Sequence, residues 1–258
     1  MHILELLWKI VRTYFHYRKG MQTIRTGKGA GQAQDVMMKT YMKGDYLTAA
    51  LRATDPFFRG CMLLELGQIG PAQQAMQQVV DSSKETKPGA LANSVLGQVF
   101  LEDKQYDRAL ECFRTAQILW QERGFPERWM AEICLRRGGN SAEALRLARR
   151  ALEKEETFPG LSADSKNISL CETLSTLAWA VAVESHDRAE VDRLLTEATG
   201  LSSANPVCST AQMHLNFGHA YNALGDTGKS IHHLDEAARI DPNGRAGRAA
   251  AMPVTARP

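Results

Sequence analysis

The residues that could carry out nucleophilic chemistry in this sequence are not spaced as that chemistry requires. Ser185, His186 and Asp187 are the residue types of a hydrolytic triad, but they are consecutive. A triad needs side chains that converge on one point, whereas neighbours on a turn point apart. The GxSxG pattern of a nucleophile elbow is also missing. We therefore interpret these three residues as a turn.

The candidate metal ligands and acid–base pairs are equally poorly placed. His214 and His219 are five residues apart, which is a poor spacing for one metal on a helix, and the neighbours His232 and His233 face different directions. The pair Glu155–Glu156 is interpreted as solvated charge on a helix face. We therefore expect no metal, no cofactor and no enzymatic activity.

Cysteine usage and charge narrow the class of protein further. Five widely spaced cysteines form no CxxC pair, so neither a zinc site nor a redox motif is indicated. We expect them to be small buried residues in a reducing compartment, and hence a cytoplasmic protein. A net charge of +2 is too weak to indicate a nucleic-acid partner. The cysteines are Cys61, Cys112, Cys134, Cys171 and Cys208.

Two stretches of the chain share one spacing pattern. Each has a glycine, an aromatic residue three positions later, a small residue twelve positions after the glycine, and a second small residue seven positions further on. Small residues at these positions allow two helices to approach closely, so the pattern predicts a helical hairpin. One hairpin cannot bury its apolar face alone, which favours a stacked array. The residues are Gly97, Phe100, Ala109 and Ala116, then Gly218, Tyr221, Ser230 and Ala237.

This pattern resembles that of the tetratricopeptide repeat family, apart from the family's tryptophan, which Asn93 and His214 replace. The resemblance implies an all-α fold, a right-handed α-α superhelix (solenoid) of about six helical hairpins, over residues 30–242. Weaker copies are centred near Ala49, Ala75, Ala144 and Ala198. The short distance from Ala49 to Ala75 predicts a shortened hairpin, and residues 157–169 are interpreted as an insertion.

The two ends of the chain do not follow the repeat. Residues 1–29 are interpreted as an amphipathic helix, over 3–17, and a Gly-rich linker, and residues 243–258 as a disordered tail. The helix caps the array, lies on a membrane surface, or docks on a partner or in the protein's own groove. It is too interrupted by charge to be a signal peptide or a membrane span. Its apolar face includes Leu4, Leu7, Trp8, Val11 and Phe15.

The resemblance also implies where a partner binds, because the first helix of each hairpin lines the concave groove in this family. Methionine and tyrosine at the start of the groove suit a hydrophobic peptide or helix, and a tryptophan beside two arginines suits a carboxylate. The implied groove residues are Met38, Tyr41, Met42, Leu64, Ser94, Gln98, Leu101, Glu102, Trp129, Ile133, Arg136, Arg137, Leu215, His219 and Asn222.

Two functional hypotheses follow. The first is a non-enzymatic scaffold or adaptor whose groove binds a peptide or helix of one or more partner proteins. The second is a membrane-peripheral assembly factor that residues 3–17 hold on the bilayer. The two differ in the role of the N-terminal helix, so vesicle binding would discriminate between them.

Overall fold

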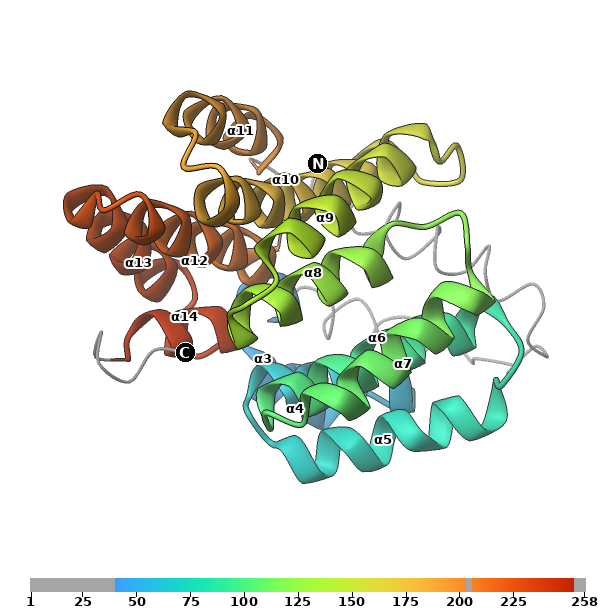
Figure 1. The fold of residues 1–258 in the computed structure, drawn as a ribbon. Helices are drawn as coiled ribbons and strands as arrows, with labels where there is room; N and C mark the ends of the chain where they lie inside the picture. The colour runs from blue at the N-terminus through green and yellow to red at the C-terminus, as the bar shows by residue number, and fades with distance from the viewer. Residues whose placement is uncertain (1–39, 203–205, 253–258) are drawn as a thin grey trace.

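A computed structural model describes residues 40–202 and 206–252, and this part of the chain contains only helices, turns and loops (Figure 1). The helices follow one another with short connections. They are α3 (Tyr46–Arg52), α4 (Pro56–Glu65), α5 (Ile69–Ser82), α6 (Lys87–Glu102), α7 (Tyr106–Leu119), α8 (Phe125–Arg137), α9 (Ser141–Thr157), α10 (Ala163–Glu184), α11 (Arg188–Leu201), α12 (Val207–Ala223), α13 (Thr227–Ile240) and α14 (Arg245–Ala250).

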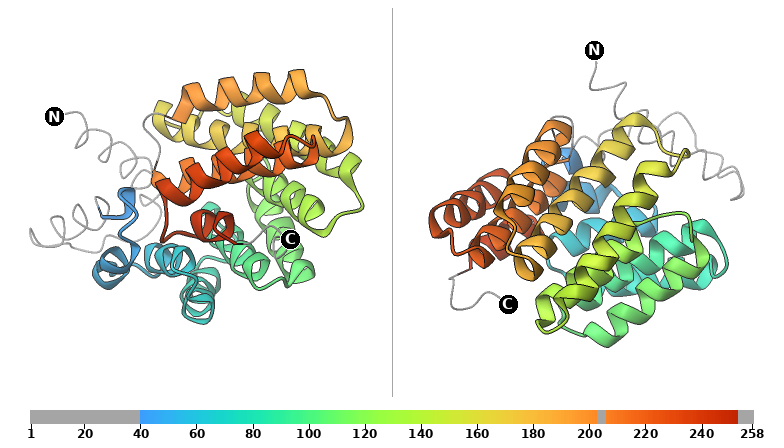
Figure 2. Two further views of the ribbon diagram at one scale, coloured as in Figure 1. Left: turned by 90° about the vertical axis from the view of Figure 1, so that its left-hand side faces the viewer. Right: turned by 45° about the horizontal axis from the view of Figure 1, so that its top comes forward.

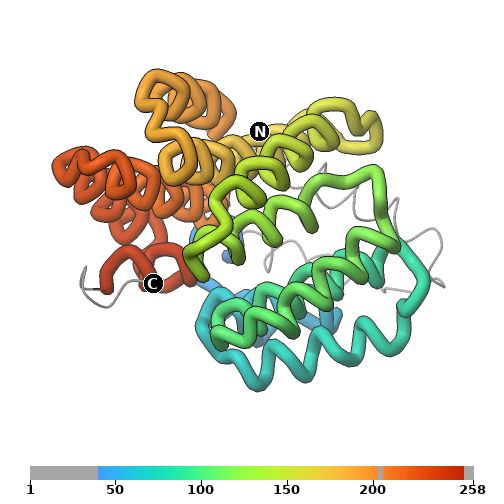
Figure 3. The backbone as a smooth tube through the Cα atoms, in the orientation of Figure 1, coloured from blue at the N-terminus to red at the C-terminus, as the bar shows by residue number. Residues whose placement is uncertain are grey.

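The helices pack as successive hairpins. Each of the pairs α4–α5, α6–α7, α8–α9, α10–α11 and α12–α13 is in close contact, and the first helices of neighbouring hairpins also contact one another. The tube in Figure 3 follows this path from the α4–α5 hairpin to the α12–α13 hairpin. Residues 40–42 are also helical and form a further, shorter hairpin with α3, in which the ring centres of Tyr41 and Tyr46 lie 5.8 Å apart. The predicted all-α array of helical hairpins is confirmed.

The turn inside each hairpin has one recurring conformation. The residue just before the second helix's N-cap lies in the left-handed region, with φ between 55° and 113°. This region disfavours side chains, which explains why four of the six positions are glycine. The residues are Gly44, Gly67, Lys104, Gly139, His186 and Gly225.

The same geometry accounts for Ser185, His186 and Asp187. Ser185 is the C-cap of α10, and His186 has a φ of 55°. Asp187 caps α11 by accepting a 3.1 Å hydrogen bond from the backbone N–H of Glu190. The three residues therefore form the turn that the sequence predicts.

Close approach of helices explains the repeated small residues. A Cβ added to Gly97 would lie 2.8 Å from the Phe113 ring, and one added to Gly218 would lie 2.6 Å from Leu234. The Ser230 hydroxyl also donates a 2.9 Å hydrogen bond to the Gly218 carbonyl. The spacing pattern is thus the contact between the two helices of one hairpin.

The sequence predicts two departures from a uniform repeat, and the structure agrees with one of them and differs from the other. The early hairpins are short, with 7 residues in α3 and 10 in α4, as the spacing predicts. The expected insertion at 157–169 is largely helical, because α10 begins at Ala163 and runs for 22 residues. The Ser162 hydroxyl caps this extended helix by accepting from the Ser165 N–H.

The first hairpin meets the last one. The Tyr46 hydroxyl donates a 2.6 Å hydrogen bond to the carboxylate of Asp241, which is the C-cap of α13. Tyr41 on the same hairpin lies 3.3 Å from the Cys208 sulfur of α12. The array therefore curves far enough to bring its two ends into contact.

Helix α14 lies between these two ends (Figure 2, left). This differs from the disordered tail that the sequence predicts from residue 243 onward. Small residues make the difference: Ala246 and Ala250 are buried against α12 and α13, and a Cβ on Gly247 would lie 1.9 Å from the Asp241 carbonyl oxygen. The alanine- and glycine-rich composition, which by itself predicts disorder, is what permits this close packing.

The N-terminal helix prediction concerns residues outside the described part. The residues of its predicted apolar face all lie outside the described residues: Leu4, Leu7, Trp8, Val11 and Phe15. Within residues 40–202 and 206–252, no helix has the length and apolar character needed to cross a bilayer.

Candidate functional site: the concave groove

One cavity opens on the inner side of the array, where residues from four predicted positions come together. It has a volume of about 190 Å³. Tyr41, Leu64, Gln98 and Trp129 line it, each from a different helical segment. The other lining residues are Cys61, Glu65, Val95, Arg128, Glu172, Cys208, Ser209, Gln212 and Arg245.

Trp129 belongs both to the hydrophobic core and to the cavity wall. It is 4% exposed, and its ring stacks on Phe113 with ring centres 6.0 Å apart and an interplanar angle of 6°. The guanidinium carbons of Arg128 and Arg245 lie 4.2 Å and 5.2 Å from its ring centre. Trp129 therefore offers cations an anchored aromatic face.

The two arginines expected to face a carboxylate ligand have partners within the protein. Arg136 lies 2.6 Å from Glu132 on its own helix and 3.7 Å from Glu102 on α6. Arg137 is half exposed and pairs with Asp107 at 3.1 Å. Neither guanidinium is thus left free for a ligand carboxylate, and the surroundings of Arg136 are acidic.

The remaining predicted groove residues do not converge on the cavity. Leu101 and Ile133 are buried in the core. His219 stacks on Trp179 with ring centres 4.6 Å apart, and Asn222 is exposed.

Three further predicted groove residues also lie away from the cavity lining. Met42 packs beside α3 and α4, Ser94 is buried, and Leu215 packs against α13 and α14. Met38 lies outside the described residues.

The sequence analysis missed most of a group of acidic residues near the cavity. Glu65 is buried and lines the cavity. Glu132 is also buried, as is most of Glu102, and both carboxylates lie next to Arg136. Only Glu102 is among the groove residues that the sequence implies. Burial raises the pKa of Glu65, and Arg245 acts in the opposite direction. We call the surface made by Glu65, Glu102, Glu132 and Trp129 the acidic groove.

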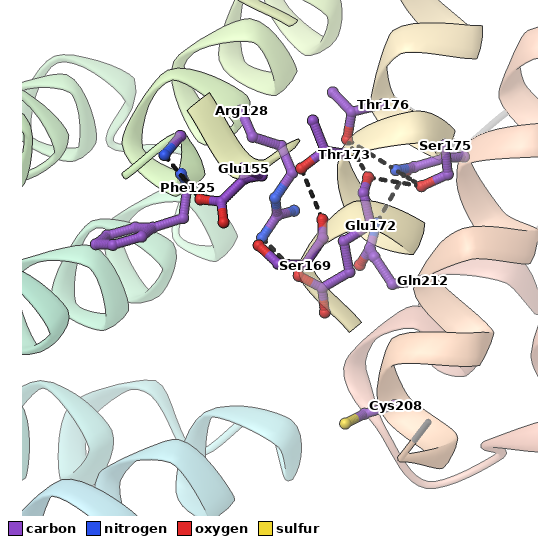
Figure 4. A network of polar contacts seen from close by, with 12 residues as sticks. Phe125, Arg128, Glu155, Ser169, Glu172, Thr173, Ser175, Thr176, Cys208 and Gln212 are labelled. Carbon is purple, nitrogen blue, oxygen red and sulfur yellow. Dashed lines mark hydrogen bonds and ion pairs between the residues drawn. The ribbon is translucent and has the colours of Figure 1, made fainter. Parts of the chain in front are cut away.

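A polar network joins α8, α10 and α12 beside this cavity (Figure 4). Arg128 of α8 pairs with Glu172 of α10 at 2.8 Å. The Asn216 side-chain amide of α12 donates to the hydroxyls of Ser175 and Thr176 at 3.1 Å and 3.2 Å. These contacts tie α8 to α10 and α10 to α12, three of the helices that line the cavity.

Glu155 is part of the scaffold and is not a solvated charge, so that interpretation is wrong. Its side chain is 0% exposed. It accepts hydrogen bonds from the backbone N–H groups of Gly124 at 2.7 Å and Phe125 at 3.1 Å, and pairs with Arg123 at 3.1 Å. A carboxylate at this position satisfies the first N–H groups of α8. Its neighbour Glu156 is exposed.

The cysteines are free thiols, and two of them line the cavity. Burial raises the pKa of Cys61 to about 12 and that of Cys208 further still. Both therefore stay protonated near neutral pH, which makes them poor nucleophiles. The described residues also contain no group of three or more His, Cys, Asp or Glu side chains arranged for a metal ion.

One hairpin of the chain matches a tetratricopeptide repeat. The family's sequence pattern, described as "Tetratricopeptide repeat", matches residues 211–243, which span most of α12 and α13. Proteins with this fold are typically protein-interaction scaffolds and usually lack catalytic activity. No curated protein matches the sequence.

Three solved structures are similar to this chain at low sequence identity. MamA is 11% identical, with a TM-score of 0.40 and coverage of 68% of this chain and 90% of that one. YrrB, titled a TPR protein with an unusual peptide-binding site, is 17% identical, with a TM-score of 0.38 and coverage of 83% and 96%. BtubC (BKLC) from P. vanneervenii is 17% identical, with a TM-score of 0.47 and coverage of 89% and 93%.

Proposed function

We propose that this protein is an interaction scaffold that binds a peptide or helix of a partner protein in its concave groove. The observation that carries this proposal is the shared cavity of Tyr41, Leu64, Gln98 and Trp129. These residues come from four separate segments of successive hairpins, each of which packs beside the next. The surface they form is concave, with an aromatic anchor and polar groups, as a recognition site requires.

The size of the cavity favours a side chain over a free small molecule. Pockets for small-molecule ligands typically have volumes of about 300–1,000 Å³, whereas this one has about 190 Å³. A single large side chain of a partner segment fits such a space. The rest of the segment would lie along the inner helices, as in other groove-binding modes.

A matched pair of glutamine variants tests this proposal. Gln98 lines the cavity, and Gln77 is exposed on α5, a second helix. Gln98→Arg fills the cavity with a side chain that suits its acidic surroundings, so the fold is expected to persist. The wild type and Gln77→Arg should capture the same partner from a lysate, and Gln98→Arg should lose it in quantitative mass spectrometry. Equal capture by all three folded proteins would contradict the groove assignment.

The amphipathic pattern of residues 3–17 supports a second candidate, a membrane-peripheral scaffold. Leu4, Leu7, Trp8, Val11 and Phe15 share one face, opposite Lys9 and Arg12. Flotation with anionic lipid vesicles tests it. Membrane attachment predicts that Trp8→Glu abolishes flotation, while a cap role predicts a lower melting temperature and no flotation of either protein.

A further inference from the structure

Helix α14 places an arginine in the acidic groove, although it follows the last hairpin of the array. The backbone N–H of Arg245 donates to the Glu65 carboxylate at 3.1 Å. Its guanidinium nitrogens lie 3.7 Å from the carboxylates of Glu65 and Glu102, and its guanidinium carbon is 5.2 Å from the Trp129 ring centre. One side chain of α14 thereby bridges three inner helices, α4, α6 and α8.

The array helices leave this region with more negative than positive charge. Arg128 pairs with Glu172, and Arg136 pairs mainly with Glu132. Buried carboxylates are costly unless they have a cationic partner. The groove therefore needs a cation from outside the array helices. The array's own charged residues here are Glu65, Glu102, Glu132 and Glu172 against Arg128 and Arg136.

Arg245 supplies this cation, but its contacts with the carboxylates are incomplete. Its side chain is only 10% exposed, yet its Nε and Nη1 atoms have no hydrogen-bond partner among the described residues. Both of its ion pairs measure 3.7 Å, which is longer than a charge-assisted hydrogen bond of about 2.7–2.9 Å. The cavity of about 190 Å³ lies directly beside it. A segment that places its guanidinium deeper could make the shorter contacts that Arg245 lacks.

We propose that the acidic groove recognises an arginine carried on a short segment rich in small residues, and that α14 is an internal copy of this ligand that a partner must displace. The inference rests on the proposed scaffold function and specifies its ligand chemistry. Arginine suits the site because a planar guanidinium can stack on Trp129 and bond two carboxylates at once, whereas a lysine ammonium cannot do both. Small neighbours are required because Ala246 and Gly247 approach the α13 end closely.

A labelled peptide of residues 241–252 provides the probe, and fluorescence anisotropy with the full chain provides the measurement. In the wild type, α14 competes for the groove. The variant Arg245→Ala/Arg248→Ala removes both anchoring side chains and should bind the peptide about tenfold or more tightly than the wild type does, because apparent affinity follows the fraction of open groove. The control Arg188→Ala/Arg239→Ala removes two exposed arginines on α11 and α13 and should behave as the wild type.

Two further arms test the chemistry of recognition. A peptide with both arginines replaced by alanine should not bind, and one with both replaced by lysine should bind at least several-fold more weakly. Adding Glu102→Gln to the Arg245→Ala/Arg248→Ala chain should weaken binding about tenfold. Absence of binding to the folded double variant, or equal binding of the alanine peptide, would overturn the proposal.

Hydrogen exchange keeps the test decisive if the double variant fails to fold. In the wild type, excess arginine peptide should speed exchange of the α14 amides, and the alanine peptide should leave them unchanged. Equal α14 exchange with either peptide would overturn the displacement mechanism. A third outcome is that the wild type self-associates and that Arg245→Ala/Arg248→Ala abolishes this association. The groove would then bind α14 of a second copy, which would contradict binding of a separate partner.

The peptide experiment and the lysate experiment can fail separately. If the peptide does not bind but Gln98→Arg still loses its captured partner, the groove function stands and the arginine ligand is wrong. If Gln98→Arg keeps the partner while the peptide binds as expected, the groove takes arginine segments but the captured partner binds elsewhere.

Discussion

The Tyr46 hydroxyl donates a 2.6 Å hydrogen bond to the Asp241 carboxylate, 195 residues further along the chain. Both residues are buried, and burial raises the pKa of Asp241 while the bond from Tyr46 acts in the opposite direction. This contact links the first hairpin to the end of the last one, next to α14. It is therefore one of the bonds that hold the groove in its closed curvature.

Removing this hydroxyl should destabilise the fold. Tyr46→Phe leaves the Oδ2 atom of the buried Asp241 carboxylate without its Tyr46 donor, while Oδ1 still accepts from the Gly244 N–H, so we expect the free energy of unfolding to fall by about 1–3 kcal/mol. Tyr106→Phe is the matched control, because the Tyr106 hydroxyl has no hydrogen bond within residues 40–202 and 206–252, and its change should stay within about 0.5 kcal/mol. Urea denaturation followed by circular dichroism measures both. Equal effects would show that the contact between the ends adds nothing.

Glu155 and Glu156 form a neighbouring pair with opposite expectations. Glu155→Gln removes the charge that neutralises buried Arg123 and caps α8, so we expect a loss of about 3–5 kcal/mol. Glu156→Gln changes an exposed side chain and should alter stability by no more than about 0.5 kcal/mol. The same urea titration measures the two variants. A small effect of Glu155→Gln would contradict its role in positioning α8.

The left-handed turns predict a stabilising substitution. His186 has a φ of 55°, a region that costs a non-glycine residue about 1–2 kcal/mol. Glycine removes this strain at a smaller cost in unfolded-state entropy, so His186→Gly should gain about 0.5–1 kcal/mol. The reverse test is Gly225→Ala, where no atom of the described residues lies within 4 Å of the new Cβ and only backbone strain acts. Thermal melts should show opposite shifts, and shifts of the same sign would refute the turn argument.

A histidine pair in the last hairpin predicts a pH dependence. Burial, reinforced by the nearby His214, lowers the pKa of His233 to about 4, and the two Nδ1 atoms lie 3.0 Å apart. The folded state thus binds fewer protons at this site than the unfolded state. The associated stability is complete above about pH 6.5 and is lost as the pH falls toward about 4.

The variant His233→Phe isolates this effect. Between about pH 7 and about pH 5, the wild type should lose about 1–2 kcal/mol more stability than the variant. Carboxylates with perturbed pKa values, such as Glu65 and Asp241, are present in both proteins and cancel in the comparison. Parallel stability–pH curves for the two proteins would exclude His233 as the source.

Local spacing is sufficient to predict the hairpins, because each depends on contacts within about 35 residues. The offsets between Gly97 and Phe113, and between Gly218 and Leu234, describe the packing of two adjacent helices, and the structure has these contacts. The turn at Ser185–Asp187 follows from the same local logic. Side-chain convergence within one hairpin is thus readable from residue types and their offsets.

The closure of the array and the occupied groove could not be predicted in this way. The meeting of Tyr46 with Asp241 depends on small rotations between hairpins that accumulate along the array, and residue spacing does not encode them. Glu155 lies on a helix that looks like a charged surface helix, and only the approach of Gly124 makes it a cap. The short α14 lacks repeat spacing, so its composition alone suggests disorder.

Site-specific photo-crosslinking in cells tests the central claim most directly, because it captures a partner of any identity at a chosen position on the protein. The crosslinking amino acid benzoylphenylalanine would replace Gln98 in the groove in one protein and Gln77 on α5 in the other. The account predicts that position 98 crosslinks to a defined partner protein, identified by mass spectrometry, and that position 77 does not. Crosslinks to the same partner at position 77 alone, or equally at both positions, would contradict binding in the concave groove.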